Sequence, residues 1–256
     1  MASKTVAIIT GANQGIGFET AKRLATEHKD YIVIMTGRRK DAIEEAAKKL
    51  QANGLTVEPL VLDVDSDESI EVAVQAVEQK HGRLDVLINN AGISRYTDPK
   101  LGDNASAAAK ARAEVVGIMN TNVAGVAAVT DAFLPLMKKS IETNKPKRIV
   151  FVSSTLGSMG YKVDPKGQNH ANVARAYTTS KAALNMLAWH YMVDLEDDAA
   201  NWKINCNCPG YCATNLNGHA GFDTAENGSI NAVRLATLGP DGETATFTNR
   251  QGTIPW

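Results

Sequence analysis

TVAIITGANQGIG, at residues 5–17, is the stretch that decides the fold of this 256-residue chain. Its first part, Thr5–Thr10, is apolar and rich in β-branched residues, as a strand buried on both faces would be. A glycine loop with the spacing Gly-x3-Gly-x-Gly follows, and Glu19–Glu27 then has helical periodicity. Turns also use glycine for conformational reasons alone, but glycines between a strand and a helix N-terminus favour a phosphate site. We therefore expect a dinucleotide to contact Thr10, Gly11, Asn13, Gln14, Gly15, Ile16 and Gly17.

Segments of the same two kinds alternate along the rest of the chain. The candidate strands are Tyr31–Thr36, Val57–Leu62, Val86–Ile88, Arg148–Val152 and Lys203–Cys208. The candidate helices are Asp41–Ala52, Ser69–Lys80, Glu114–Lys139 and Ala174–Leu195. Repeated strand-helix-strand units imply right-handed crossovers and a parallel sheet with helices on both faces. The pattern predicts a doubly wound α/β fold, and the length suits a single domain.

The composition is that of an ordinary soluble protein. Hydrophobic residues make up 44%, charged residues 21%, and the net charge is −1, which favours neither a nucleic-acid nor a membrane partner. Val6–Ile9 is already a candidate strand, so we expect no signal peptide. We find no apolar run of about 18 residues that could span a bilayer. These features predict a cytoplasmic protein.

The chain has three cysteines, Cys206, Cys208 and Cys212. Their odd number does not suit a secreted disulfide framework. No histidine or fourth cysteine stands at a usual ligand spacing, so we predict no metal site.

Three polar connections interrupt the alternation, and they are Ser94–Ala113, Leu156–Val173 and Tyr211–Asp223. Each follows a strand, and ligands bind at the carboxyl ends of parallel strands. We expect these connections to form the walls of an active site.

Arg38 and Arg39 follow the second candidate strand. At this position a carboxylate would accept hydrogen bonds from the ribose of NAD, whereas guanidinium groups bind the additional phosphate of NADP. The alternative is that both arginines only solvate the next helix, where cations are disfavoured at the N-terminus. We predict NADP(H) as the cofactor.

Tyr177 and Lys181 are four positions apart and share one face of a helix. A tyrosine phenol, whose pKa is ordinarily about 10, becomes a useful acid or base when a neighbouring cation lowers that pKa. Such pairs also occur on exposed helix faces without a catalytic role, so the surrounding motifs must decide whether this pair is catalytic.

Those motifs occur together and in order along the chain. They are Thr-Gly-x3-Gly-x-Gly at 10–17, Asp63, Asn89-Asn90-Ala91-Gly92, Asn122, Ser153-Ser154, Tyr177-x3-Lys181, and Pro209-Gly210 followed by Thr214. With them the chain resembles the short-chain dehydrogenase/reductases over essentially its whole length. The 23 positions from Ser154 to Tyr177 make it most similar to carbonyl reductases and to salutaridine and menthone reductases. The resemblance implies a single Rossmann-type domain of about seven strands in the order 3-2-1-4-5-6-7, with further elements at Glu226–Leu238 and Thr246–Thr248. Residues 1–92 would form mainly the NADP-binding half, and residues 93–256 the catalytic and substrate-binding half.

The resemblance also implies a role for each catalytic residue. Tyr177 would be the general acid/base, and Ser154 would hydrogen-bond the substrate oxygen. Lys181 would lower the pKa of Tyr177 and hold the nicotinamide ribose, and a backbone group of Asn122 would hold a water molecule. The family pattern of a serine three residues before a glycine selects Ser154 over Ser153.

The remaining expected contacts lie at the strand ends and in the polar connections. Further cofactor contacts would be Asp63, Val64, Asn90, Ala91, Gly92, Pro209, Gly210, Cys212 and Thr214. The substrate pocket would be lined by Ser94, Tyr96, Ser154, Leu156, Met159, Tyr161, Tyr211, Leu216 and Phe222. These walls suit a medium-sized ketone or aldehyde, with a quinone or 1,3-diketone as alternatives, although each residue could also serve loop packing. The thiol of Cys208 would either lie near this pocket or pack within its strand.

We expect an NADPH-dependent carbonyl reductase that acts on a small molecule. The alternatives are an NADP-linked alcohol dehydrogenase that works oxidatively and a catalytically silent NADP(H)-sensing protein. In the family, the helices before Lys139 and around Tyr177 commonly pair between subunits, but members with long insertions tend to be monomers. We expect a monomer or a weak homodimer.

Overall fold

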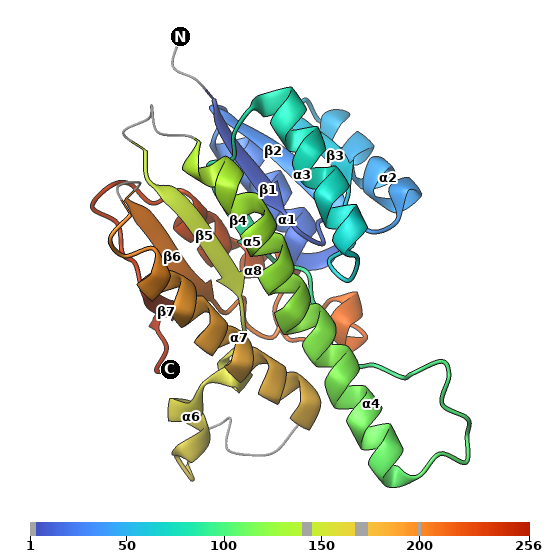
Figure 1. Cartoon of the computed structure of the whole chain (residues 1–256). Coiled ribbons are helices and arrows are strands. Elements are labelled where there is room, and N and C mark those ends of the chain that lie inside the picture. Colours follow the sequence, from blue (N-terminus) through green and yellow to red (C-terminus); the bar gives the residue numbers. More distant parts are fainter. Residues whose placement is uncertain (1–3, 140–144, 167–173, 199–200) are drawn as a thin grey trace.

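An eight-stranded sheet forms the centre of the structure, in the order β3-β2-β1-β4-β5-β6-β7-β8 (Figure 1). The computed structural model describes residues 4–139, 145–166, 174–198 and 201–256. The strands are β1 (Thr5–Ile9), β2 (Tyr31–Gly37), β3 (Val57–Val61), β4 (Val86–Asn89), β5 (Lys147–Val152), β6 (Trp202–Asn207), β7 (Thr246–Asn249) and β8 (Gly252–Thr253). The first seven strands are parallel, which confirms the predicted doubly wound fold and strand order.

Helices cover both faces of the sheet. The α-helices are α1 (Gly15–Glu27), α2 (Lys40–Gln51), α3 (Asp67–His81), α4 (Ala107–Met119), α5 (Gly125–Lys138), α6 (Met159–Val163), α7 (Arg175–Asp194) and α8 (Ala225–Ala236). Three short turns are η1 (Asn120–Ala124), η2 (Thr155–Gly157) and η3 (Asn215–Asn217).

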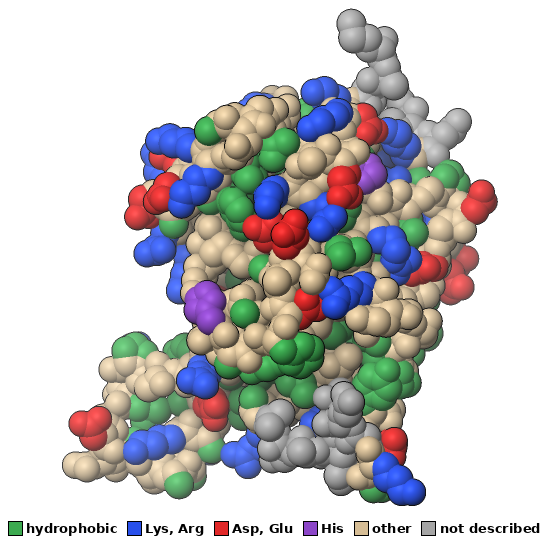
Figure 2. Space-filling model, turned by 180° about the vertical axis from the view of Figure 1, so that it is seen from behind, with side chains coloured by type: hydrophobic (Ala, Val, Ile, Leu, Met, Phe, Trp, Pro, Cys, Tyr) green, Lys and Arg blue, Asp and Glu red, His purple; other side chains and the backbone are tan. Residues whose placement is uncertain are grey.

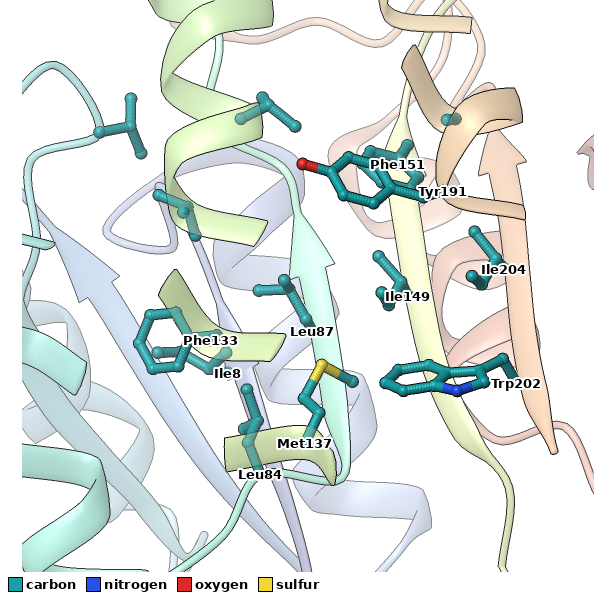
Figure 3. Packing of buried hydrophobic residues seen from close by; sticks show 14 of the residues in the cluster. Ile8, Leu84, Leu87, Phe133, Met137, Ile149, Phe151, Tyr191, Trp202 and Ile204 are labelled. Atoms are coloured by element: carbon teal, nitrogen blue, oxygen red, sulfur yellow. The ribbon is translucent and has the colours of Figure 1, made fainter. Parts of the chain in front are cut away.

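The core divides into two layers because side chains alternate along each strand. In β1, Val6 and Ile8 pack with α3, α5 and α7, whereas Ala7 and Ile9 pack with α1, α2 and α8. Figure 3 shows the first layer, in which Phe133 lies beside Ile8. Two apolar faces explain why the strand segments are almost continuously hydrophobic rather than alternating.

Three elements differ from the sequence-based expectation. β8 is an added two-residue strand, and it pairs with β7 in the antiparallel direction. The polar connection after β5 contains the turn η2 and the short helix α6. The helix expected at Glu114–Lys139 begins earlier, at Ala107, where the hydroxyl of Ser106 accepts a hydrogen bond from the Ala109 N–H at 3.2 Å.

The helical run Ala107–Lys138 corrects the expectation that no segment is long and apolar enough to span a membrane. By length and composition alone this run could cross one. Its second half, α5, packs in the core through the fully buried Val129 and Phe133. Core packing therefore explains the apolar composition of α5.

The connection after β4 and the first turns of α4 project from the body of the molecule as a lobe (Figures 1 and 2). Tyr96, in the connection after β4, packs on the last turn of α4, where a Cβ on Gly117 would be 2.2 Å from its ring.

Candidate active site

A cleft of about 620 Å³ lies at the carboxyl ends of the parallel strands. Its volume is within the range of small-molecule and cofactor sites. Most of the residues predicted to bind a cofactor line it. They are Gly11, Asn13, Gln14, Gly15, Ile16, Gly17, Arg38, Asp63, Val64, Asn90, Ala91, Gly92, Tyr177, Lys181, Pro209 and Thr214. The structure thus brings together segments from both halves of the chain.

The glycine loop is shaped by close contacts that side chains would prevent. A Cβ on Gly17 would lie 2.5 Å from both the Gly11 carbonyl oxygen and Asn90 Nδ2. Gly11 itself has a φ of +63°, which glycine adopts without strain. Asn90 Nδ2 donates to the carbonyl oxygens of Thr10 at 2.8 Å and Gly11 at 3.1 Å, and these bonds fix the loop against β4. The loop and the α1 N-terminus form a cradle of the kind that binds a pyrophosphate.

Four predicted cofactor residues do not line the cleft. Thr10 is buried, and its Oγ1 accepts hydrogen bonds from the N–H groups of Asn90 and Ala91, both at 2.9 Å. Arg39 occupies the N-cap position of α2, and Gly210 lies in the turn after β6. The thiol of Cys212 points toward α8, where a Cβ on Gly228 would be 2.6 Å from its sulfur. Thr10 and Cys212 are therefore buried behind the walls of the cleft, whereas Arg39 and Gly210 are exposed.

Tyr177, Ser154 and Lys181 meet at the end of β5. The Tyr177 hydroxyl hydrogen-bonds to Ser154, which also accepts from the Leu156 N–H at 3.2 Å. Lys181 Nζ lies 5.7 Å from the centroid of the Tyr177 ring and donates to the Val152 carbonyl oxygen at 2.8 Å. A phenol, a hydroxyl and a buried amine can hold a substrate oxygen and move a proton to it.

That Lys181 lowers the pKa of Tyr177 stays a prediction, because burial has the largest effect on both groups. Burial raises the pKa of the Tyr177 phenol well above its usual value, and the hydrogen bond to Ser154 offsets this only in part. Burial also lowers the pKa of Lys181 to about 8. Burial is therefore the largest influence on the pKa of Tyr177, and the phenol is protonated at neutral pH.

Asn122 lies outside the cleft, fully buried within the π-helical turn η1. Its Oδ1 accepts from the Ile93 N–H at 2.8 Å, and its Nδ2 donates to the Ile93 carbonyl oxygen and to Ser180 Oγ, both at 2.9 Å. Ser180 Oγ in turn donates to the Tyr177 carbonyl oxygen at 2.7 Å. The Asn122 side chain thus joins the loop after β4 to the helix of Tyr177. π-Helical turns of this kind are frequent at functional sites.

The predicted substrate wall is reproduced only in part. Ser94 and Leu216 line the cleft, and Ser94 Oγ donates to the Leu216 carbonyl oxygen at 2.6 Å. The other predicted wall residues do not line it, although Ser154 reaches Tyr177. Tyr96 packs on α4 instead, and Tyr211 contacts Phe222 edge to face with ring centroids 5.7 Å apart. Leu156, Met159 and Tyr161 belong to η2 and α6.

Several residues that line the cleft were not predicted. They are Gly37, Leu62, Asp65, Ile93, Arg95, Thr121, Val152, Ser153, Asn215, Asn217 and Gly218. Most are chain neighbours of predicted residues, so extending each motif by one or two positions would have found them. Ser153, expected only to pack or cap, lines the cleft and donates to Asn185 Oδ1 at 2.6 Å.

The three cysteines are free thiols buried in the structure. Cys208 Sγ accepts a hydrogen bond from the Thr155 N–H at 3.2 Å, directly after Ser154. Burial raises the pKa of the Cys208 thiol, which disfavours the reactive thiolate. In the described ranges, no group of three His, Cys, Asp or Glu residues could hold a metal ion.

Several known proteins are similar to this chain in sequence and in fold. Residues 5–224 match the family model for short chain dehydrogenases. The chain belongs to the short-chain dehydrogenase/reductase family. Short-chain dehydrogenase anuI from Penicillium roqueforti is 39% identical over 94% of this chain and 92% of its own length. Carbonyl reductase [NADPH] 1 from Rattus norvegicus is 30% identical over 99% of both chains. The structure of salutaridine reductase from Papaver somniferum has a TM-score of 0.76 and 26% identity, covering 94% of this chain and 98% of that one.

These relatives confirm the predicted subgroup of carbonyl and salutaridine reductases. The protein is an oxidoreductase of small molecules, and its family uses a nicotinamide cofactor. The cleft fits such a cofactor, because the glycine loop at the N-terminus of α1 and Arg38 after β2 line the same cavity.

Proposed function

We propose that this protein reduces a ketone or an aldehyde to an alcohol with NADPH as the hydride donor. The observation that carries the proposal is that Tyr177, which hydrogen-bonds to Ser154, lines the same cleft as the glycine cradle. The intact set of polar groups argues against a catalytically silent sensor. An oxidative reaction would use the same groups in reverse.

The chain's own residues supply the proton and the binding of the substrate oxygen. A bound nicotinamide cofactor would supply the hydride to the carbonyl carbon. Ser154 Oγ and the Tyr177 hydroxyl would hold the carbonyl oxygen and stabilise the negative charge that develops there. Tyr177 would then donate its proton, because an alkoxide is more basic than a phenolate. The raised pKa of Tyr177 keeps the phenol protonated and so suits the reductive direction.

Lys181 would add positive charge beside Tyr177 whenever it is protonated. Because burial lowers its pKa to about 8, the ammonium is present below that pH and is lost above it. We expect the kcat/KM of reduction to be level at neutral pH and to fall as the pH rises through 8. Initial rates at saturating NADPH in buffers of increasing pH would measure this. In Lys181→Arg, whose guanidinium stays charged, any remaining activity should persist to higher pH. A wild-type profile that stays level through alkaline pH would contradict this role.

Arg38 supports NADP(H) as the cofactor. It lines the cleft immediately after β2 and is exposed there, with no ion pair among the described residues. Its guanidinium could form charge-assisted hydrogen bonds with a phosphate on the adenosine ribose. The rat relative, whose name specifies NADPH, agrees with this choice.

Arg38→Ala should weaken NADPH binding by about tenfold to a hundredfold, the loss expected for one charge-assisted hydrogen-bond pair. The affinity for NADH, which lacks the phosphate, should change little. Fluorescence titration with each cofactor measures both constants. Arg39→Ala is the matched control, because Arg39 does not line the cleft. An equal loss of affinity for NADH and NADPH would show that Arg38 does not bind the additional phosphate of NADPH.

Substrate, location and assembly remain predictions. We propose a medium-sized, partly apolar carbonyl compound, a cytoplasmic protein, and a monomer or weak homodimer.

A further inference from the structure

Pro255 and Trp256 pack on the segment that follows the catalytic serine. Ser158 Oγ donates to the Pro255 carbonyl oxygen at 2.5 Å, and the Gly160 N–H donates to the Trp256 carbonyl oxygen at 2.6 Å. Ser158 is fully buried, and its hydroxyl also accepts from the Tyr161 N–H, which starts α6. The two carbonyl groups therefore hold the first turn of α6 in place.

The Pro255 side chain lies close against Gly160. A Cβ on this residue would lie 2.7 Å from Pro255 Cβ and 3.2 Å from the main-chain oxygen of Trp256. Pro255 and Trp256 therefore leave room only for glycine at position 160.

The indole of Trp256 contacts two further elements, α7 and β7. It contacts Trp189 of α7 edge to face, with ring centroids 5.9 Å apart, and Phe247 of β7 at 5.6 Å. Helix α7 also carries Tyr177. Figure 1 shows this end of the chain close to α6 and α7.

The position of α6 is coupled to Ser154 through the turn η2. The Ser154 carbonyl oxygen accepts from the Gly157 N–H at 2.8 Å, and Ser158 follows directly. A Cβ on Gly157 would lie 2.6 Å from the Lys181 carbonyl carbon, so the turn rests on the backbone of α7. A shift of α6 would therefore be transmitted to Ser154 along three residues of tightly packed chain.

We propose that Pro255 and Trp256 are positioning residues for the carbonyl-binding side of the active site. Neither lines the cofactor cleft, and both act through α6 and η2 on the orientation of Ser154 Oγ. The inference rests on the proposed reductase function. It predicts that losing the Trp256 contacts impairs use of the carbonyl substrate while leaving cofactor binding intact.

The test compares Trp256→Ala, Trp256→Phe and Gly160→Ala with the wild type. For Trp256→Ala we expect kcat/KM for the carbonyl to fall about tenfold, mainly through KM, with the NADPH dissociation constant within about twofold. Trp256→Phe keeps an aromatic ring and should restore most of the loss. Gly160→Ala must displace Pro255 and should act in the same direction as Trp256→Ala. Hydrogen–deuterium exchange of residues 155–163 should be faster in Trp256→Ala and Gly160→Ala.

Trp202→Phe is the control for general destabilisation, since this buried indole lies at the amino-terminal end of β6, whereas the cleft lies at the carboxyl ends of the strands. It should lower the melting temperature without changing the KM for the carbonyl. Unchanged exchange in Trp256→Ala, or faster exchange with an unchanged KM, would overturn the inference. So would an equal rise of KM in Trp202→Phe. If the wild type reduces no carbonyl, the proposed function fails, whereas the exchange experiment still decides whether Trp256 holds this segment.

Discussion

Replacing Tyr177 with phenylalanine should nearly abolish carbonyl reduction while leaving NADPH binding intact. The substitution removes only the hydroxyl, which hydrogen-bonds to Ser154 and is the proposed proton donor. Without it, the oxygen of the substrate must take its proton from water and loses one hydrogen bond as its charge develops. General acid catalysis of this kind is worth about a hundredfold to ten-thousandfold, so we expect kcat/KM to fall by about a thousandfold.

NADPH oxidation in the presence of a carbonyl substrate measures the rate, and fluorescence titration measures cofactor affinity. Tyr31→Phe is the matched control, because its hydroxyl donates to the Ala236 carbonyl oxygen at 3.3 Å, away from the cleft. That variant should retain the wild-type rate. A Tyr177→Phe protein with more than about a tenth of the wild-type kcat/KM would remove Tyr177 from the proposed mechanism.

Gly17→Ala should weaken cofactor binding and destabilise the fold together. The new Cβ would lie 2.5 Å from the Gly11 carbonyl oxygen and from Asn90 Nδ2, so the glycine loop must move. Such overpacking costs about 1–3 kcal/mol of folding free energy. Because the displaced backbone forms the proposed pyrophosphate cradle, we expect NADPH affinity to fall by at least about a hundredfold.

Thermal unfolding and cofactor titration measure the two effects of Gly17→Ala separately. Gly239→Ala is the control, since no heavy atom lies within 4 Å of a Cβ at that position. It should change neither quantity appreciably. Normal NADPH affinity in a folded Gly17→Ala protein would show that the loop is not the cofactor cradle.

The sheet could be predicted from the sequence because its strands are buried on both faces. Such strands form continuous apolar runs between amphipathic helices, and this periodicity is visible without any contact information. β8 was missed because a two-residue edge strand has no periodicity of its own. The π-helical turn η1 was also missed, because a single extra residue in a turn leaves the apolar pattern of α4 and α5 intact.

The sequence could predict that the catalytic residues lie close together, but it could not predict their burial or their pKa values. The spacing of Tyr177 and Lys181 places them on one helix face, but it does not reveal how deeply they are buried. Burial has the largest effect on both pKa values, and the spacing alone could not show this. The effect of Lys181 on the pKa of Tyr177 stays a prediction.

The walls of the cleft were the least predictable part, since loop side chains can point either way. Tyr96 and Cys212 lie within two positions of cleft residues in the sequence, yet they pack against α4 and α8. The Tyr96 ring packs against Gly117 and the Cys212 thiol against Gly228, where there is no side chain in the way. The sequence does not show that these residues are in contact.

The central claim is that the cleft transfers hydride from NADPH to a carbonyl carbon. The most direct measurement uses NADPH deuterated at the nicotinamide C4 on the transferred face, a panel of ketones and aldehydes, and mass spectrometry of the products. We predict an alcohol that carries deuterium on its carbinol carbon, formed by the wild type and by Tyr31→Phe but not by Tyr177→Phe. An alcohol without deuterium, or no alcohol from any member of the panel, would contradict the claim.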